Sequence, residues 1–68
     1  MAENLIVTMG DLRRAGICAA GARRWFPLHG FDFRDFLKNG IAAERLLATD
    51  DPFARRAVEE ARKRVSNG

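Results

Sequence analysis

The sequence has very few of the residues that build disulfide frameworks or metal sites. It contains one cysteine, Cys18, and one histidine, His29. A single cysteine cannot form a disulfide within the chain, which fits a reducing compartment. The same scarcity excludes thiolate zinc sites and histidine clusters, because a metal ion needs several such ligands. We therefore expect no metal and no cofactor.

Long apolar runs are also missing. No stretch approaches the roughly 18 apolar residues of a membrane-spanning helix, so no segment is predicted to cross a membrane. The first residues, MAENLIVTMG, lack the basic start and long apolar run of a signal peptide. Together with the single cysteine, these absences predict a cytoplasmic protein.

The length of the chain limits its chemistry. Its 68 residues predict one domain over 1–68, and a chain of this size buries only about 60% of the surface that its unfolded form exposes. A catalytic cleft needs a supporting shell, and no pair of nucleophile and base stands out. The sequence therefore predicts a protein that is not an enzyme, with an ordered core over 7–65 and frayed ends at 1–4 and 66–68.

Arginine is abundant, and acidic residues are interspersed with it. Twelve basic and nine acidic residues give a net charge of +3, and ten of the twelve basic residues are arginine. Arginine suits two-point contacts to carboxylates and phosphates. Because the acids lie among the arginines, the pattern favours a mixed surface over the dense basic tail of a nucleic-acid-binding protein.

Capping and turn residues divide the chain into about five short helices. The first has Thr8 as its N-cap and Asp11 to complete a capping box, and it ends at Gly16. The second begins after Cys18 and ends near Gly30. On one face of this second helix the apolar residues are Ala22, Trp25 and Phe26.

The third helix is predicted between Asp32, as its N-cap, and Gly40, with the stripe Phe33, Phe36 and Leu37. The fourth is expected over about 42–48 and presents Leu46 and Leu47.

The last and longest helix begins at Asp51-Pro52. Its predicted buried face consists of Phe53, Ala54, Ala57, Val58, Ala61 and Val65. On its outer face, basic and acidic residues four positions apart are predicted to form ion pairs. The first of these pairs is Arg55–Glu59 and the last is Glu60–Arg64. Residues 5–7 can be extended, but no alternation is long enough for a sheet. The predicted fold class is all-α.

The first and third helices begin similar units 24 residues apart. When 7–22 is laid over 31–46, both capping boxes and both Gly-Ile corners align, and four of the sixteen pairs are identical. This pattern predicts two pseudo-repeated helical hairpins, clasped by the C-terminal helix. The glycines at the corners, Gly16 and Gly40, fit the left-handed residue that follows a helix.

The first unit resembles two families of small helical domains. Its corner is similar to that of helix-hairpin-helix proteins at Leu12, Ala15, Gly16, Ile17 and Ala22. It also resembles the Asp-Leu-x-x-x-Gly-Ile-x-x-x-Gly-x-Arg signature of SAM domains at Asp11, Leu12, Gly16, Ile17, Gly21 and Arg23. More loosely, the chain resembles small uncharacterised proteins encoded in phage and prophage structural clusters.

The helix-hairpin-helix resemblance implies sequence-independent DNA binding, in which N–H groups at the start of a helix hold a phosphate. The first corner leaves its helix start open, whereas Glu44 occupies the start of the helix in the second. Cys18 stands where the family has a second glycine. The candidate residues are Arg13, Arg14, Gly16, Cys18, Gly21, Arg23 and Arg24. DNA binding predicts that these arginines converge on the start of the second helix.

Protein binding is the leading functional prediction, because the resemblance to SAM domains implies that such a hairpin forms a protein-binding surface. It predicts an exposed apolar patch that includes Trp25. The cluster Arg62, Lys63 and Arg64 is a second candidate, for an acidic partner. We expect a small interaction module that binds a protein or itself, as an accessory or structural component of a phage-like assembly. Weak DNA binding is the alternative, and no membrane or small-molecule partner is expected.

Overall fold

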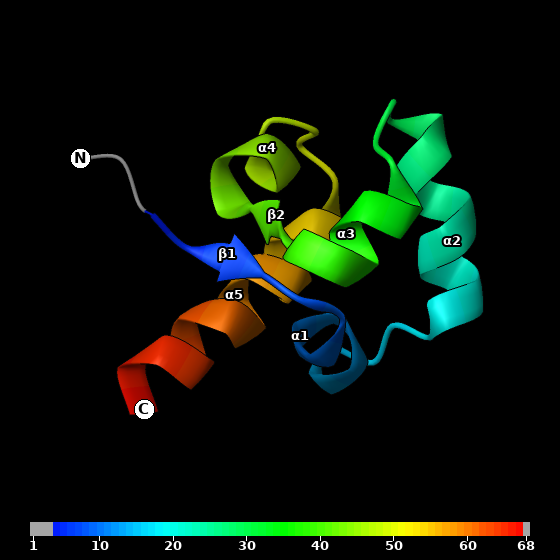
Figure 1. Cartoon of the computed structure of the whole chain (residues 1–68). Coiled ribbons are helices and arrows are strands. Elements are labelled where there is room, and N and C mark those ends of the chain that lie inside the picture. The colour runs from blue at the N-terminus through cyan, green and yellow to red at the C-terminus, as the bar shows by residue number, and fades with distance from the viewer. Residues whose placement is uncertain (1–3, 68) are drawn as a thin grey trace.

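The structure is a computed structural model that describes residues 4–67, and it is mostly helical (Figure 1). Within that range it has five helices and one two-stranded sheet. The elements in chain order are β1 (Ile6–Val7), α1 (Met9–Arg14), α2 (Ala19–Leu28), α3 (Phe33–Asn39), β2 (Ile41–Ala42), α4 (Ala43–Leu47) and α5 (Pro52–Asn67). Of the ends that are predicted to fray, residues 1–3 and 68 lie outside the described residues. Helix α5 extends to Asn67, two residues past the predicted end of the ordered core at residue 65.

The described residues are mainly helical, as the sequence predicts, and they also form one small sheet that was not predicted. Strands β1 and β2 pair in antiparallel register, with Ile6 opposite Ala42 and Val7 opposite Ile41. Each strand has only two residues, so neither carries the alternation from which a strand is predicted. The pairing depends on Gly40, which lets the chain pass close to β1 and is described below.

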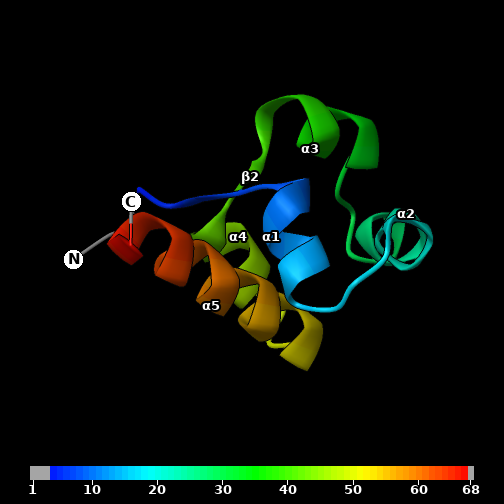
Figure 2. The ribbon, with the colours of Figure 1, turned by 90° about the horizontal axis from the view of Figure 1, so that it is seen from below.

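Helix α5 supports the rest of the molecule. It packs against α1, α4 and β1, while α2 packs against α3 and contacts α1 (Figure 2). The face of α5 that meets its neighbours carries Ala54, Ala57 and Ala61, which are fully buried. These small side chains let the neighbouring helices approach closely.

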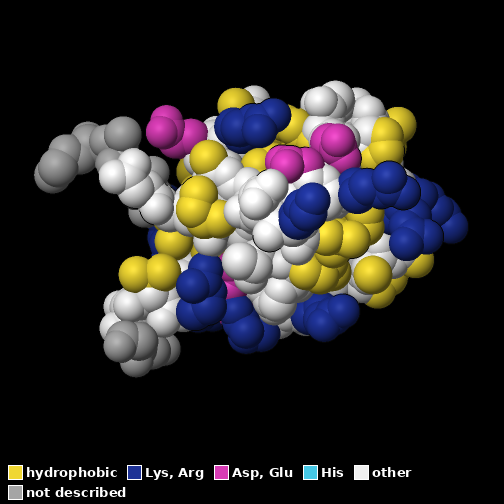
Figure 3. Space-filling view, in the orientation of Figure 1, with side chains coloured by type: hydrophobic (Ala, Val, Ile, Leu, Met, Phe, Trp, Pro, Cys, Tyr) yellow, Lys and Arg dark blue, Asp and Glu magenta, His cyan; other side chains and the backbone are white. Residues whose placement is uncertain are grey.

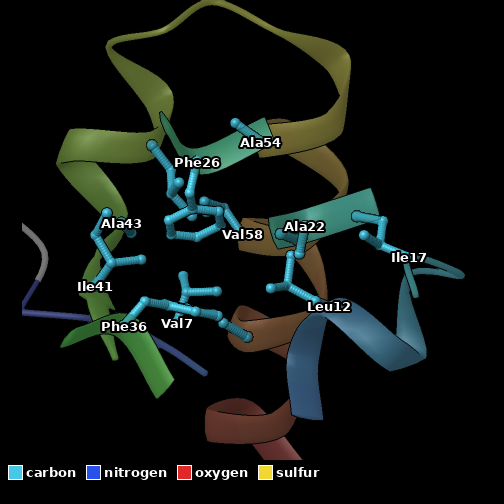
Figure 4. Packing of buried hydrophobic residues seen from close by; sticks show 13 residues of the cluster. Val7, Leu12, Ile17, Ala22, Phe26, Phe36, Ile41, Ala43, Ala54 and Val58 are labelled. Carbon is cyan, nitrogen blue, oxygen red and sulfur yellow. The ribbon is translucent and has the colours of Figure 1, made fainter. Parts of the chain in front are cut away.

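One hydrophobic core joins all five helices and both strands. Phe26 and Phe36 are its largest side chains, and Figure 4 places Phe26 between Ala43 and Val58. The core also includes Leu12 from α1. The remaining core residues are Val7, Ile17, Ala22, Ile41, Leu46, Ala54, Ala57 and Ala61.

Three apolar residues predicted to face the core are exposed. Val65 is 56% exposed and Leu37 53%, and Leu47 lies at the border of the exposed class at 36%. Leu37 and Leu47 each follow a buried residue, Phe36 and Leu46, and their helices turn them away from the core. In α5 the buried face stops at Ala61, one turn before Val65.

The charged face of α5 also differs from the prediction. Two of its ion pairs form at a spacing of three, with Arg62 3.6 Å from Glu59 and Lys63 3.3 Å from Glu60. Arg55, predicted to pair with Glu59, lies 2.6 Å from Asp50. Arg64, predicted to pair with Glu60, reaches Asp11 instead. A long-range partner has therefore replaced the local one.

Candidate functional site

The first corner is a helix-ending turn, as the sequence predicts. Gly16 has a φ of +83°, and its N–H donates to the carbonyl of Arg13 over 3.0 Å. The N–H of Ile17 donates to the carbonyl of Leu12 over 2.9 Å, and Ile17 is buried. These two bonds form a Schellman motif, so the geometry of the corner is explained by helix capping alone.

The start of α2 is open to solvent but capped by a thiol. Cys18 is the N-cap, and its Sγ accepts the N–H of Gly21 over 3.4 Å. Ala19, Ala20 and Gly21 are exposed. A sulfur atom is a weak acceptor, so this cap satisfies the helix start less well than a hydroxyl or carboxylate does.

The four arginines around this corner do not act as one group. Arg14 pairs with the carboxylate of Asp11, and Arg23 lies over the ring of Phe33, 5.9 Å from its centre. Arg13 and Arg24 are exposed. Figure 3 shows Lys and Arg side chains gathered along the side of the molecule formed by α2. The predicted convergence of all four arginines on the helix start is not what the structure has, because Asp11 holds Arg14.

The second corner is occupied by the chain itself. Gly40 has φ +74° and ψ −172°, and a Cβ at this position would lie 2.5 Å from Ile6 Cγ2 and 2.8 Å from the carbonyl oxygen of Val7. The N–H of Ala43 donates to the carbonyl of Leu5 over 2.9 Å. Residues 5–7 therefore cover the start of α4 at the second corner. At the first corner, in contrast, the start of α2 is open to solvent.

Trp25 is a packing residue between α2 and α5. Its ring stacks on Phe53 with centroids 4.3 Å apart and lies 4.2 Å from the ring of His29. Its Nε1–H donates to Asp51 Oδ2 over 3.2 Å. The half-buried indole is thus covered and its donor satisfied, so it does not provide the exposed apolar patch that the sequence predicts.

The same cluster contains the predicted cap of α5 at Asp51 and a contact of Asp51 with His29 that the sequence does not reveal. His29 Nε2 lies 3.9 Å from Asp51 Oδ2, and Asp51 Oδ1 accepts the N–H of Phe53 over 2.9 Å. The bonds from Phe53 and then Trp25 lower the pKa of Asp51 below its usual value. His29 and Asp51 lie 22 positions apart (51 − 29) on different helix ends, so local spacing along the sequence does not indicate their approach.

Asp11 is the one charged residue of the described chain that is buried. Its carboxylate is fully buried and accepts from the N–H of Thr8 over 2.9 Å. Arg14 and Arg64 also donate to it. Burial alone raises the pKa of Asp11, but the bonds from Arg64, Thr8 and Arg14 lower it by more. The carboxylate therefore stays ionised, with two guanidinium groups around it.

Arg64 connects this buried carboxylate to the surface. Its Nε donates to Asp11 Oδ1 over 2.9 Å, and its Nη2 donates to Asp11 Oδ2 over 3.1 Å. Nη2 also donates to the carbonyl of Ile6 over 2.9 Å. The pair with Asp11 raises the pKa of Arg64. The structure thus gives one member of the predicted basic cluster a fixed position beside β1.

A depression of about 580 Å³ lies between the start of β1 and the end of α5. We call it the terminal groove. Its lining contains the exposed apolar residues Ile6 and Val65, which are 45% and 56% exposed. The full lining is Asn4, Leu5, Ile6, Arg62, Arg64, Val65 and Ser66. Two of the three predicted basic residues border the groove, but Ile6 and Val65 were not predicted as site residues.

Two further observations concern the described part of the chain. No group of three or more His, Cys, Asp and Glu residues between 4 and 67 is placed to hold a metal ion. Over the same residues, none of the helices combines the length and apolar character needed to cross a bilayer.

The chain was compared with protein-family models, with curated proteins and with solved structures. None of the three comparisons found a match.

Proposed function

We propose that this chain is a small protein-binding module without enzymatic activity, and that the terminal groove is its binding surface. The observation that carries the proposal is the pair of exposed apolar side chains, Ile6 and Val65, in one depression bordered by Arg62 and Arg64. Protein interfaces combine an apolar centre with a polar rim in which arginine is enriched. This groove has both parts.

The walls of the groove are held together from within the fold. Arg64 bonds the carbonyl of Ile6 and the carboxylate of Asp11, and β1 is paired to β2 on its other side. A surface that is already ordered loses little conformational freedom when a partner binds. Leu28, in contrast, is 80% exposed at the end of α2 without bordering this groove.

The proposal includes a role for the two hairpins. In both, an N-cap residue is followed three positions later by an aspartate, and a glycine with positive φ precedes a buried isoleucine. These shared features support an origin as two pseudo-repeated units clasped by α5, similar to SAM-like domains. In this proposal the hairpins are the scaffold that brings β1 beside the end of α5, in an accessory or structural component of a phage-like assembly.

Selection from a random peptide library on the immobilised protein tests this function. We expect enriched peptides whose affinity falls at least tenfold on Val65→Ser, because the substitution removes apolar lining without touching the core. Leu28→Ser is the matched control, since it removes another exposed apolar side chain away from the groove. Enriched peptides that bind Val65→Ser and the unchanged protein equally contradict the groove as the binding surface, and so does the absence of enrichment.

DNA binding by the first corner is a second candidate. The open start of α2 and the exposed Arg13 and Arg24 favour it, and each phosphate contact would be sensitive to salt. A short duplex titrated at low and moderate salt tests it by amide chemical shifts. DNA binding predicts shifts confined to residues 16–24 that salt abolishes and that Arg24→Ala weakens, while the control Arg55→Ala does not. Shifts that are absent or independent of salt contradict it.

A further inference from the structure

We propose that the terminal groove selects peptide segments in which a carboxylate lies next to an apolar side chain, and that Arg64 is the group that receives the carboxylate. This inference rests on the proposed function, because it names the partner chemistry of the same groove. It follows from three observations: the N–H groups of Arg64 that bond no acceptor among the described residues, the charges around the groove, and the hydrogen bond that already occupies the carbonyl of Ile6 in β1.

Arg64 uses only part of its hydrogen-bonding capacity inside the protein. A guanidinium group has five N–H donors. The one on Nε and the two on Nη2 are directed at Asp11 and at the carbonyl of Ile6. Among the described residues, no acceptor is bonded to Nη1, and the side chain is 40% exposed. The two N–H groups of Nη1 therefore remain for a ligand, and they point in different directions from one nitrogen.

The position of this guanidinium is fixed before any ligand binds. Two of its nitrogens bond the fully buried carboxylate of Asp11, which in turn is held by Thr8. A flexible arginine must be ordered when it binds a carboxylate, and that ordering costs free energy. In Arg64 the fold has ordered the planar group already, which is the condition for selective recognition of an oxyanion.

The charges around the groove favour an anionic ligand. Asp11 carries one negative charge and is paired with two arginines, Arg14 and Arg64, so this cluster keeps a net positive charge. Among residues 4–67, those that line the groove include Arg62 and Arg64 but no Asp or Glu. A ligand carboxylate brings the opposite charge, and one of its oxygens accepts from Nη1 of Arg64 in a charge-assisted hydrogen bond.

The apolar part of the groove defines the rest of the ligand. Ile6 and Val65 are exposed beside Arg64, and Leu5 is half-buried. An apolar side chain next to the carboxylate would cover them and exclude water from the ion pair. The carbonyl of Ile6 already accepts from Arg64, so a peptide that adds to β1 as a further strand would compete with this bond. We therefore infer recognition through side chains rather than through strand addition.

Two peptides that differ in one group test this inference. The probes are acetyl-Leu-Val-Glu-Leu-amide and the same peptide with Gln in place of Glu, titrated into the full chain and followed by amide chemical shifts. We expect both to shift residues 5–7 and 62–66, with about fivefold tighter binding of the Glu peptide, a difference typical of a solvent-exposed charge contact. Added salt should reduce the difference, because it screens the charge.

Variants separate the role of Arg64 from general stability. Arg64→Gln should remove the preference for the Glu peptide. Because this substitution also removes contacts to Asp11, the matched control is Arg14→Gln, which takes away the other arginine on the same carboxylate outside the groove. A preference that survives in a folded Arg64→Gln protein, or that is lost equally in Arg14→Gln, overturns the assignment.

The outcomes distinguish this inference from the proposed function. If both peptides shift the groove residues with equal affinity, carboxylate selection is wrong and peptide binding in the groove stands. If neither peptide shifts residues 5–7 or 62–66, the groove is not a peptide site, and both proposals fall.

Discussion

Asp11 and Arg64 lie 53 positions apart in the chain and form a two-point ion pair, with N–O distances of 2.9 and 3.1 Å. The pair joins the first turn of α1 to the last turns of α5. One partner is fully buried and the other lines the terminal groove. A structural contact therefore also positions the arginine that we propose as the ligand-binding group.

Replacement of Asp11 by Asn should destabilise the fold. The substitution leaves the side-chain shape but removes the charge that Arg14, Arg64 and Thr8 bond. Loss of charge-assisted hydrogen bonds at a buried group costs about 1–3 kcal/mol. Urea unfolding followed by the fluorescence of Trp25, the single tryptophan of the chain, measures the change.

Asp35 provides the matched control for this substitution. It occupies the same position in the cap of α3 as Asp11 does in the cap of α1, but it is exposed. Asp35→Asn should change the free energy of unfolding by less than about 0.5 kcal/mol, as is usual for surface substitutions. Equal effects of the two substitutions would show that the buried ion pair adds nothing beyond a local helix cap.

Stability should fall in acid, and Asp11 should be one cause. Its folded pKa lies below the usual 3.8, so its contribution is complete above the unfolded pKa and is lost as the pH falls through the folded pKa. The lowered pKa of Asp51 acts in the same direction. Unfolding free energies measured from pH 6 to pH 2 should therefore decline, and less steeply in Asp11→Asn than in the unchanged protein. Parallel curves for the two proteins would contradict this assignment.

Gly40 should tolerate alanine much less well than Gly16. Both glycines have positive φ; a Cβ in the left-handed conformation of a helix-ending glycine such as Gly16 costs about 1–2 kcal/mol, and the ψ of −172° at Gly40 lies in a region that essentially only glycine adopts. At Gly16 no atom lies within 4 Å of the added Cβ, whereas at Gly40 it would meet Ile6 and the backbone of Val7. Gly16→Ala should lower the free energy of unfolding only by the cost of placing a Cβ at positive φ. Gly40→Ala should lower it further, because it also breaks the β1–β2 pairing. Thermal unfolding compares the two, and similar melting temperatures would mean that β1 can shift away at little cost.

The sequence predicts the helices well because their signals are local. Two helix starts are capped by local pairs, Thr8 with Asp11 and Asp32 with Asp35, and Gly16 ends α1. Each of these residues lies within a few positions of the helix end that it determines. Side-chain caps and positive-φ glycines act over one turn, so spacing alone identifies them. The sheet is missed for the opposite reason, since its two-residue strands meet only after the chain has folded.

The candidate site is less predictable than the fold. Helical periodicity gives the side of α5 on which Val65 lies, but not the point at which the core ends. The basic cluster is visible in the sequence, whereas the contact of Arg64 with Asp11 and Ile6 depends on tertiary packing. Trp25 shows the same limit, because Phe53, on which its ring stacks, lies 28 positions (53 − 25) further along the chain.

Cys18 should act as a replaceable helix cap. Its Sγ accepts the N–H of Gly21 at the start of α2, and a hydroxyl is a better acceptor than a thiol in this role. Cys18→Ser should therefore leave stability unchanged or raise it by up to about 1 kcal/mol, while Cys18→Ala should lower it by about 0.5–1 kcal/mol. Urea unfolding of the three proteins measures the order. Because Cys18 is exposed, it should also react with a thiol reagent in the folded protein at a rate close to that in urea. A serine variant less stable than the alanine variant would mean that the thiol is held by packing and not by the bond to Gly21.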